Sequence, residues 1–223
     1  MSTLEIAGVT VTGAHGPVLG PTSLTVGMGE RLLVAGGPGH GHAALALAAA
    51  GRMRTDAGTV LLDGSGDRRT LARAVALVDV PGVSEPIASV PLHAVVGEEL
   101  AVARRPSGRA AAAAWLDQHG LSPWERSRFE HVPPAARTML LAELTALRPG
   151  VRFLVLVLPD RHGAPPATWW EQAGRLTGRG LGVVAQCAPA AAALLGVPAV
   201  LAPTGAAEAA TADGSSHPAE ETR

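Results

Sequence analysis

The sequence contains no lysine, no asparagine and no tyrosine, and it has one cysteine, Cys187. A single thiol cannot form an internal disulfide, and all 18 basic residues are arginines. No apolar run reaches the ~20 residues that a membrane-spanning helix needs, because arginine, glycine or proline interrupts each one. The first residues lack the basic and then apolar pattern of a signal peptide. We therefore expect a cytoplasmic chain with no membrane span of its own.

Charge is also nearly balanced, with a formal net charge of -1. A nucleic-acid partner requires a basic surface that neutralises phosphates, so we expect none. With 223 residues, of which 47% are hydrophobic, the chain is long enough to bury a substantial core. We predict one domain over residues 1–203. Residues 204–223 are small and polar without an apolar period, and we predict a disordered tail there.

The chain is organised around a glycine-rich turn between an apolar run and an alanine-rich helix, at residues 32–45. The spacing from Gly36 to Ala43 is that of the phosphate-binding motif G-x-x-x-x-G-K-[ST], but His42 replaces the lysine and Ala43 the magnesium-binding hydroxyl. Backbone N–H groups at a helix N-terminus can still bind an anion, although such a turn also serves tight helix packing. The predicted binding residues are Gly36, Gly37, Pro38, Gly39, His40, Gly41, His42, Ala43 and Ala44.

Apolar patterning predicts strands that alternate with helices, and therefore a mostly parallel core sheet. Alternation in residues 4–11 and 23–26, with a turn between them, predicts antiparallel strands near the N-terminus. Strands are expected at 31–35, 75–80, 153–158, 182–186 and 199–201, and helices at 43–50, 168–177 and 188–195. The stretch 92–147 is helical in pieces at 94–103, 109–118 and 135–147, which indicates an inserted helical subdomain.

From Leu4 to about Pro203 the chain resembles the nucleotide-binding domain of ATP-binding cassette (ABC) transporters. The most specific match is the helix and glycine of residues 45–51 followed by D-x-G-x-hydrophobic-x-x-x-G at residues 56–64. The resemblance implies an α/β fold of the P-loop NTPase type. Its parts would be a mostly parallel core sheet, an N-terminal antiparallel β-subdomain and the helical subdomain of residues 92–147.

The resemblance also locates the functional motifs, and the sequence departs from them. The aromatic ring that stacks on adenine would precede Val18, where the only ring is His15. The glutamine that reaches the metal and the permease falls at Val80. The signature before the last helix of the helical subdomain falls at Val132-Pro133-Pro134, where two prolines remove N–H groups that would grip a phosphate.

The acidic motif of the family is missing as well. The aspartate for magnesium and the glutamate for the attacking water fall at Val157 and Leu158. Asp160, just after a proline, is expected to be a solvated turn residue. The switch histidine is replaced by Gln186 or Cys187.

These departures predict a degenerate subunit, a pseudoenzyme with weak ATP binding, poor magnesium coordination and little hydrolysis of its own. Its implied partners are a membrane permease, which would hold it at the inner face of the membrane, and a second nucleotide-binding subunit or a copy of itself. If His42 contributes, binding should strengthen as pH falls toward 6. Two alternatives stay open: an active ATPase compensated by a partner or by arginines such as Arg52 or Arg137, and a regulatory or scaffolding domain that kept the fold.

Overall fold

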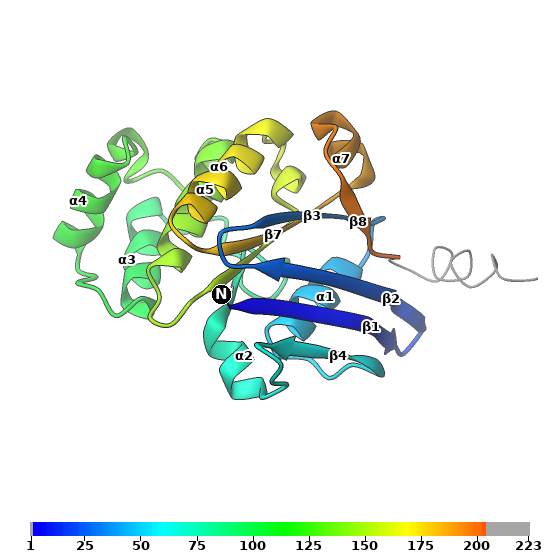
Figure 1. Cartoon of the computed structure of the whole chain (residues 1–223). Helices are drawn as coiled ribbons and strands as arrows, with labels where there is room; N and C mark the ends of the chain where they lie inside the picture. Colours follow the sequence, from blue (N-terminus) through cyan, green and yellow to red (C-terminus); the bar gives the residue numbers. More distant parts are fainter. Residues whose placement is uncertain (1, 204–223) are drawn as a thin grey trace, which may run out of the picture.

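The N-terminal part forms the predicted antiparallel sheet, which has three strands in the computed structural model (Figure 1). They are β1 (Thr3–Gly13), β2 (Gly16–Gly27) and β4 (Ala57–Leu62), in the order β2-β1-β4. A tight turn joins β1 to β2, so β2 begins well before residue 23, where the sequence pattern predicted it. The structure describes residues 2–203; the disorder predicted for 204–223 lies outside this range and stays a prediction.

Asp56 and Gly58, from the most specific part of the resemblance, attach β4 to β1. The Asp56 carboxylate accepts a hydrogen bond from the Thr12 N–H at 2.6 Å. Gly58 has a φ of +77°, and a Cβ at this position would lie 2.4 Å from the carbonyl oxygen of Ala7. Only glycine combines this conformation with such a close approach of two backbones. The motif therefore serves the construction of the sheet.

Five parallel strands form the core sheet, in the order β5-β6-β7-β3-β8. They are β3 (Arg31–Ala35), β5 (Val75–Val78), β6 (Phe153–Val157), β7 (Gly182–Cys187) and β8 (Ala199–Leu201). Every residue of β6 and β7 is buried, because both faces of the sheet are covered. Side chains alternate between two cores: Val155 packs beneath the antiparallel sheet, whereas Leu154 and Leu156 pack against helices on the opposite face. The predicted parallel core sheet is thus confirmed.

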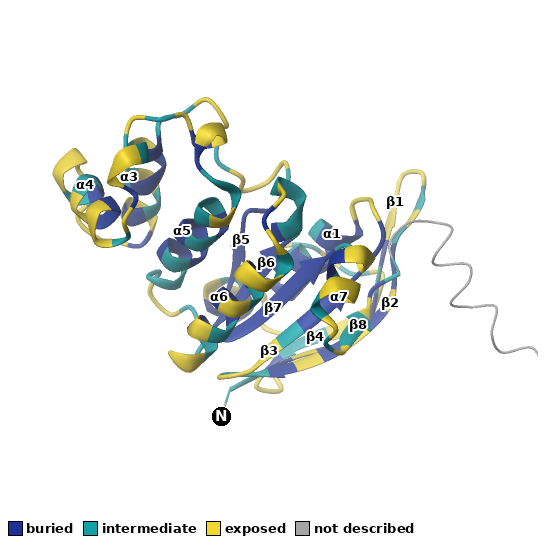
Figure 2. Cartoon of the chain, turned by 90° about the horizontal axis from the view of Figure 1, so that it is seen from above, coloured by how far each residue is buried: buried dark blue, intermediate teal, exposed yellow. Residues whose placement is uncertain are grey.

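Helices cover both faces of the core sheet (Figures 1 and 2). One face carries α1 (Gly41–Ala49), which contacts both sheets and is buried on most sides, and the short α2 (Arg68–Ala74). The other face carries α6 (Pro166–Gly178) and α7 (Pro189–Leu195). The residues that connect these helices to the strands lie at the two opposite ends of the sheet.

A group of helices projects from the core beyond β5 and forms the predicted helical insertion (Figure 2). Its members are α3 (Leu92–Val102), α4 (Arg109–Gln118) and α5 (Pro134–Ala146), with short 3-10 turns at Ser122–Trp124 and Phe129–His131. Trp115, Leu116 and Leu140 are buried between the helices and belong to the same apolar core as β6. The insertion is therefore packed onto the core sheet through α5.

Three details of the sequence interpretation are corrected. The helix α2 was not predicted, although Asp67 caps it by accepting from the Thr70 N–H at 2.9 Å. β5 ends at Val78 and not at residue 80, because Asp79 has a left-handed φ of 59°. β6 ends at Val157, because Leu158 also adopts a left-handed conformation, with a φ of 49°.

Candidate functional site

The glycine-rich turn joins the end of β3 to the start of α1, as predicted. The Gly36 N–H continues the sheet by donating to the carbonyl of Cys187 at 3.2 Å, and α1 begins at Gly41. Pro38, Gly39 and His40 are exposed, and Gly39 has a φ of +136° that requires glycine. The first N–H groups of an α-helix have no partner within the helix. The turn therefore keeps the shape of an anion site at a helix N-terminus.

The imidazole of His42 lies inside this turn and is 1% exposed. Its Nε2 is 3.1 Å from the carbonyl oxygen of Gly36, so Nε2 carries the hydrogen and the lone pair of Nδ1 is buried without a partner in residues 2–203. Burial lowers the pKa of His42 below 6.5, although the Gly36 carbonyl and the negative charge of Asp160 act in the opposite direction. The ring is thus neutral near pH 7. Contact with a phosphate would require it to leave the carbonyl.

Since the pKa of His42 is lowered in the folded chain, we expect protonation to favour unfolding. The unfolded state takes up the proton first as pH falls through 6.5, so the free energy of unfolding should decrease between pH 7.5 and pH 5.5, with a slope of at most about 1.4 kcal/mol per pH unit. Urea unfolding at several pH values measures this slope. In His42→Gln the slope should flatten; an identical slope in the variant would show that other groups cause it.

Two further polar side chains lie close to His42 beneath the turn. Gln186 is fully buried, and neither of its amide atoms has a hydrogen-bond partner within residues 2–203. Asp160 was expected to be a solvated turn residue; instead its Oδ2 accepts from the Ala188 N–H at 3.1 Å and its Oδ1 is buried. Burial and the charge of Asp160 raise the pKa of the Cys187 thiol to about 12. Cys187 is therefore a protonated core residue.

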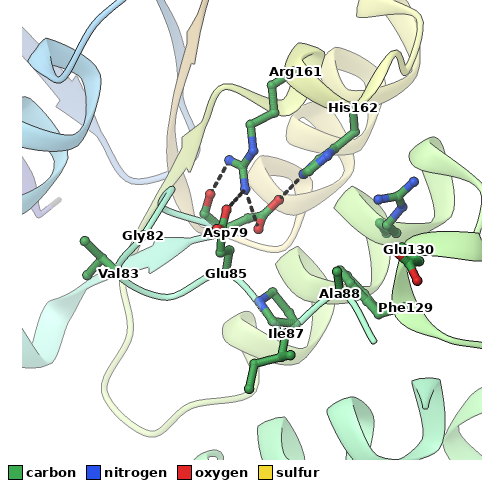
Figure 3. A pocket seen from close by; sticks show the side chains of 12 residues that line it. Asp79, Gly82, Val83, Glu85, Ile87, Ala88, Phe129, Glu130, Arg161 and His162 are labelled. Carbon is green, nitrogen blue, oxygen red and sulfur yellow. Dashed lines mark hydrogen bonds and ion pairs between the residues drawn. The ribbon is translucent and has the colours of Figure 1, made fainter. Parts of the chain in front are cut away.

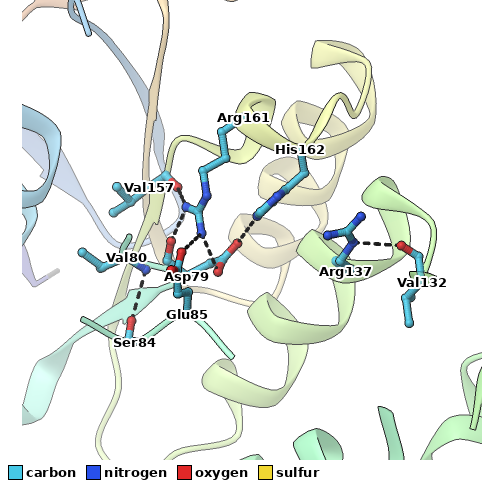
Figure 4. Close-up of polar contacts among 9 residues, drawn as sticks. All are labelled: Asp79, Val80, Ser84, Glu85, Val132, Arg137, Val157, Arg161 and His162. Atoms are coloured by element: carbon cyan, nitrogen blue, oxygen red, sulfur yellow. Dashed lines mark hydrogen bonds and ion pairs between the residues drawn. The ribbon is translucent and has the colours of Figure 1, made fainter. Parts of the chain in front are cut away.

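A buried ion cluster that the sequence interpretation missed connects the ends of β5 and β6 (Figure 4). Asp79 is 7% exposed; its Oδ1 accepts from Arg161 Nη2 at 2.8 Å and its Oδ2 lies 3.0 Å from His162 Nε2. Arg161 also donates to the carbonyl oxygens of Asp79 and Val157 and to Glu85. The available signal was a carboxylate near the end of the strand predicted at 75–80 and Arg-His shortly after the strand predicted at 153–158, since the carboxyl ends of parallel strands lie on the same side of a sheet.

A cavity of about 420 Å³ opens beside this cluster, between the segment that follows β5 and the start of α5 (Figure 3). Val83 and Ile87 lie on its rim and are 56% and 70% exposed. Arg137 lines the opposite side, where its Nε donates to the carbonyl of Val132 at 2.8 Å. The cavity thus combines exposed apolar side chains with charges of both signs.

Comparison with known proteins decides the fold. No protein-family sequence model matches the chain. Over 62 residues it is 44% identical to the hemin import ATP-binding protein HmuV of Myxococcus xanthus, a match that covers 28% of this chain and only 23% of that protein. A nucleotide-free ATP-binding cassette from an ABC transporter superposes with a TM-score of 0.62 over 95% of this chain and 94% of that chain, at 13% identity. The chain has the ABC ATP-binding-cassette fold.

Two other solved structures agree. The ATP-binding subunit of an ABC transporter gives a TM-score of 0.59 at 17% identity, over 85% of this chain and 81% of that chain. An ATP-binding cassette in its ADP conformation gives 0.58 at 14% identity, over 84% and 82%. This likeness confirms the predicted architecture of the cassette.

In this chain, the positions that the resemblance assigns to metal and water carry hydrocarbon side chains. Val80 is buried and donates its N–H to Ser84 Oγ at 3.1 Å. Val157 is buried at the end of β6, and Leu158 is partly buried. Among residues 2–203 no group of three His, Cys, Asp or Glu side chains is placed to hold a metal ion. Of the carboxylates near this end of the sheet, Asp79 is paired with Arg161, and Asp160 accepts a hydrogen bond from the Ala188 N–H.

The signature and adenine-stacking positions that the resemblance implies also lie within the described residues. Pro133 caps α5 and Pro134 is its first residue, so neither offers an N–H at the helix start where the signature would lie. His15 is exposed in the turn between β1 and β2. No helix within residues 2–203 has the length and apolar character to cross a membrane. A nucleotide role for His15 and for the turn stays a prediction.

Proposed function

We propose that the chain is the ATP-binding-cassette subunit of a transporter, that it docks on a membrane permease, and that it hydrolyses little or no ATP by itself. One observation carries the proposal. The chain has the cassette fold, but at the end of the core sheet beside the turn it has the hydrocarbon side chains of Val80, Val157 and Leu158. Phosphoryl transfer to water requires a metal, its ligands and a group that orients the water. None of these three side chains can supply them.

Weak binding of ATP is compatible with what remains. The N–H groups at the start of α1 favour an anion through hydrogen bonds and the helix dipole. The lysine that would bridge the terminal phosphates is replaced by His42, which is neutral and turned inward. Without a well-held magnesium ion, the charge of the triphosphate opposes binding. We infer an affinity well below that of a cassette with a complete motif.

The cavity beside Asp79 supports a docking role. Its lining includes Asp79, the residue before the buried Val80, where the resemblance implies contact with the permease, and Val83 and Ile87 expose apolar surface there. Exposed apolar side chains near charges of both signs are typical of a protein interface. We infer that a permease helix occupies this cavity at the inner face of the membrane. A second nucleotide-binding subunit or a copy of this chain completes the assembly.

Charge on the rim should break docking. We expect Val83→Asp with Ile87→Asp to reduce co-purification with a co-expressed permease subunit at least tenfold, because two carboxylates would be buried in an apolar contact. Leu194→Asp is the matched control, since Leu194 is 79% exposed on α7, away from the cavity. Equal co-purification of all three proteins would contradict the proposal. ATP turnover by the wild-type complex would favour the active-ATPase alternative.

A further inference from the structure

We propose that four arginines at the opposite end of the core sheet form a binding site for a small multivalent phosphate anion, such as a diphosphate group. The glycine-rich turn follows the carboxyl end of β3. The arginine site flanks the amino ends of β5 and β6, because Arg73 precedes β5 and Val151 precedes β6 along the chain. The core strands are parallel, so the two sites lie at opposite ends of the strands.

The site is a cavity of about 470 Å³ whose lining includes four arginines and no acidic residue. Each arginine comes from the end of a different helix: Arg52 follows α1, Arg73 is in the last turn of α2, Arg104 follows α3 and Arg148 follows α5. The cavity therefore joins the helical insertion to the core. Four of the 18 cations of a chain with a net charge of -1 share this space.

Three of these guanidinium groups have no partner in the described part of the chain. The side chains of Arg52, Arg73 and Arg104 make no hydrogen bond or ion pair with any residue in the range 2–203. Arg148 is paired with Glu99 through its Nη2, at 2.7 Å, but its Nε is buried without an acceptor among the described residues. Like charges that share a cavity repel, and an anionic ligand would remove that repulsion.

One of these arginines has a strained backbone, and another packs against a glycine. Arg104 has a left-handed φ of 57°, a conformation in which helix ends usually place glycine. Arg73 lies across Gly150, where an added Cβ would be 2.9 Å from its Nε. Helix C-termini attract cations, which accounts for one arginine at each helix end. That attraction does not account for an arginine in a strained conformation or for a shared cavity without a carboxylate.

The chemistry of the lining defines the ligand. Guanidinium groups bind phosphate oxygens through paired, charge-assisted hydrogen bonds. A cavity of this volume suits a small molecule. Three unpaired cations match a ligand with two or more negative charges. The site differs from the glycine-rich turn, which offers backbone N–H groups.

Isothermal titration calorimetry of the full chain with inorganic pyrophosphate tests the proposal. Arg73→Gln combined with Arg104→Gly should raise the dissociation constant at least tenfold. Glycine suits the left-handed position of residue 104, so a loss of binding would not come from misfolding, and circular dichroism checks this. Arg126→Gln removes another exposed arginine, one whose side chain has no partner in the described range, and should change the dissociation constant less than twofold. Binding should also weaken as salt is raised.

The glycine-rich turn supplies the second control. His40→Asp places a negative charge at the start of α1, where it repels an anion and is compatible with the helix dipole. Pyrophosphate should bind to the arginine site of this variant with the same dissociation constant and the same stoichiometry as in the wild-type chain. Absence of binding by the wild type, unchanged binding by the double variant, or complete loss in His40→Asp would each overturn the proposal. None of these results depends on ATP hydrolysis or on permease docking.

Discussion

Replacement of Arg161 by alanine should lower the free energy of unfolding by about 2–3 kcal/mol, one of the largest single effects that we expect. Removal of one member of a buried ion pair leaves the other charge uncompensated, which costs about 3–5 kcal/mol where burial is complete. Asp79 is 7% exposed and would keep only His162, while the carbonyls of Asp79 and Val157 would lose a donor. Chemical denaturation in urea measures the change.

Two comparisons attribute that loss to the ion cluster. Arg126→Ala removes an exposed arginine that has no ion pair within residues 2–203, and it should change stability by less than about 0.5 kcal/mol. In Asp79→Asn, the loss caused by Arg161→Ala should become smaller, because no buried charge is left behind. Asparagine also tolerates the left-handed backbone at residue 79. Additive losses in the double variant would contradict coupling between Asp79 and Arg161.

Restoration of the lysine and the hydroxyl should separate ATP binding from hydrolysis. In His42→Lys with Ala43→Ser we expect ATP affinity to rise about tenfold or more, because a charge-assisted hydrogen bond contributes about 1.5–3 kcal/mol. The new hydroxyl should also make affinity depend on magnesium. Turnover should stay at background, since Val157 and Leu158 still offer no carboxylate.

Single variants identify the source of the gain. Ala43→Ser alone should change affinity little, because the imidazole would still occupy the space beneath Gly36. His42→Lys alone should account for most of the increase. Calorimetry with ATP, with magnesium and with chelator, distinguishes these cases. Turnover that appears on restoration of residues 42 and 43 alone would mean that carboxylates elsewhere serve the reaction.

Most of the fold follows from local patterns in the sequence. The continuous apolar runs at β6 and β7 indicate strands covered on both faces, and the order of strands and helices indicates a parallel sheet. The ends of strands were less predictable. Asp79 and Leu158 end β5 and β6 through left-handed backbone conformations, which depend on contacts formed only in the folded chain. The helix α2 is short and has a weak apolar pattern.

The candidate site shows the same limit. Spacing alone located the glycine-rich turn, because its shape depends on local glycines. The direction of His42 depends on the carbonyl of Gly36 and on burial by the rest of the core, so the sequence suggested a phosphate contact where the structure has an inward ring. Asp79 and Arg161 are 82 residues apart, and only the parallel pairing of β5 and β6 brings them together.

The most direct test of the proposed loss of hydrolysis is the effect of magnesium on the binding and hydrolysis of ATP. The wild-type chain should bind ATP weakly, with the same affinity in magnesium and in chelator, and should release no phosphate above background in a steady-state assay. This result follows from Ala43, Val157 and Leu158, which offer no oxygen side chain to a metal ion. Magnesium-dependent phosphate release that disappears in His40→Asp would contradict the account.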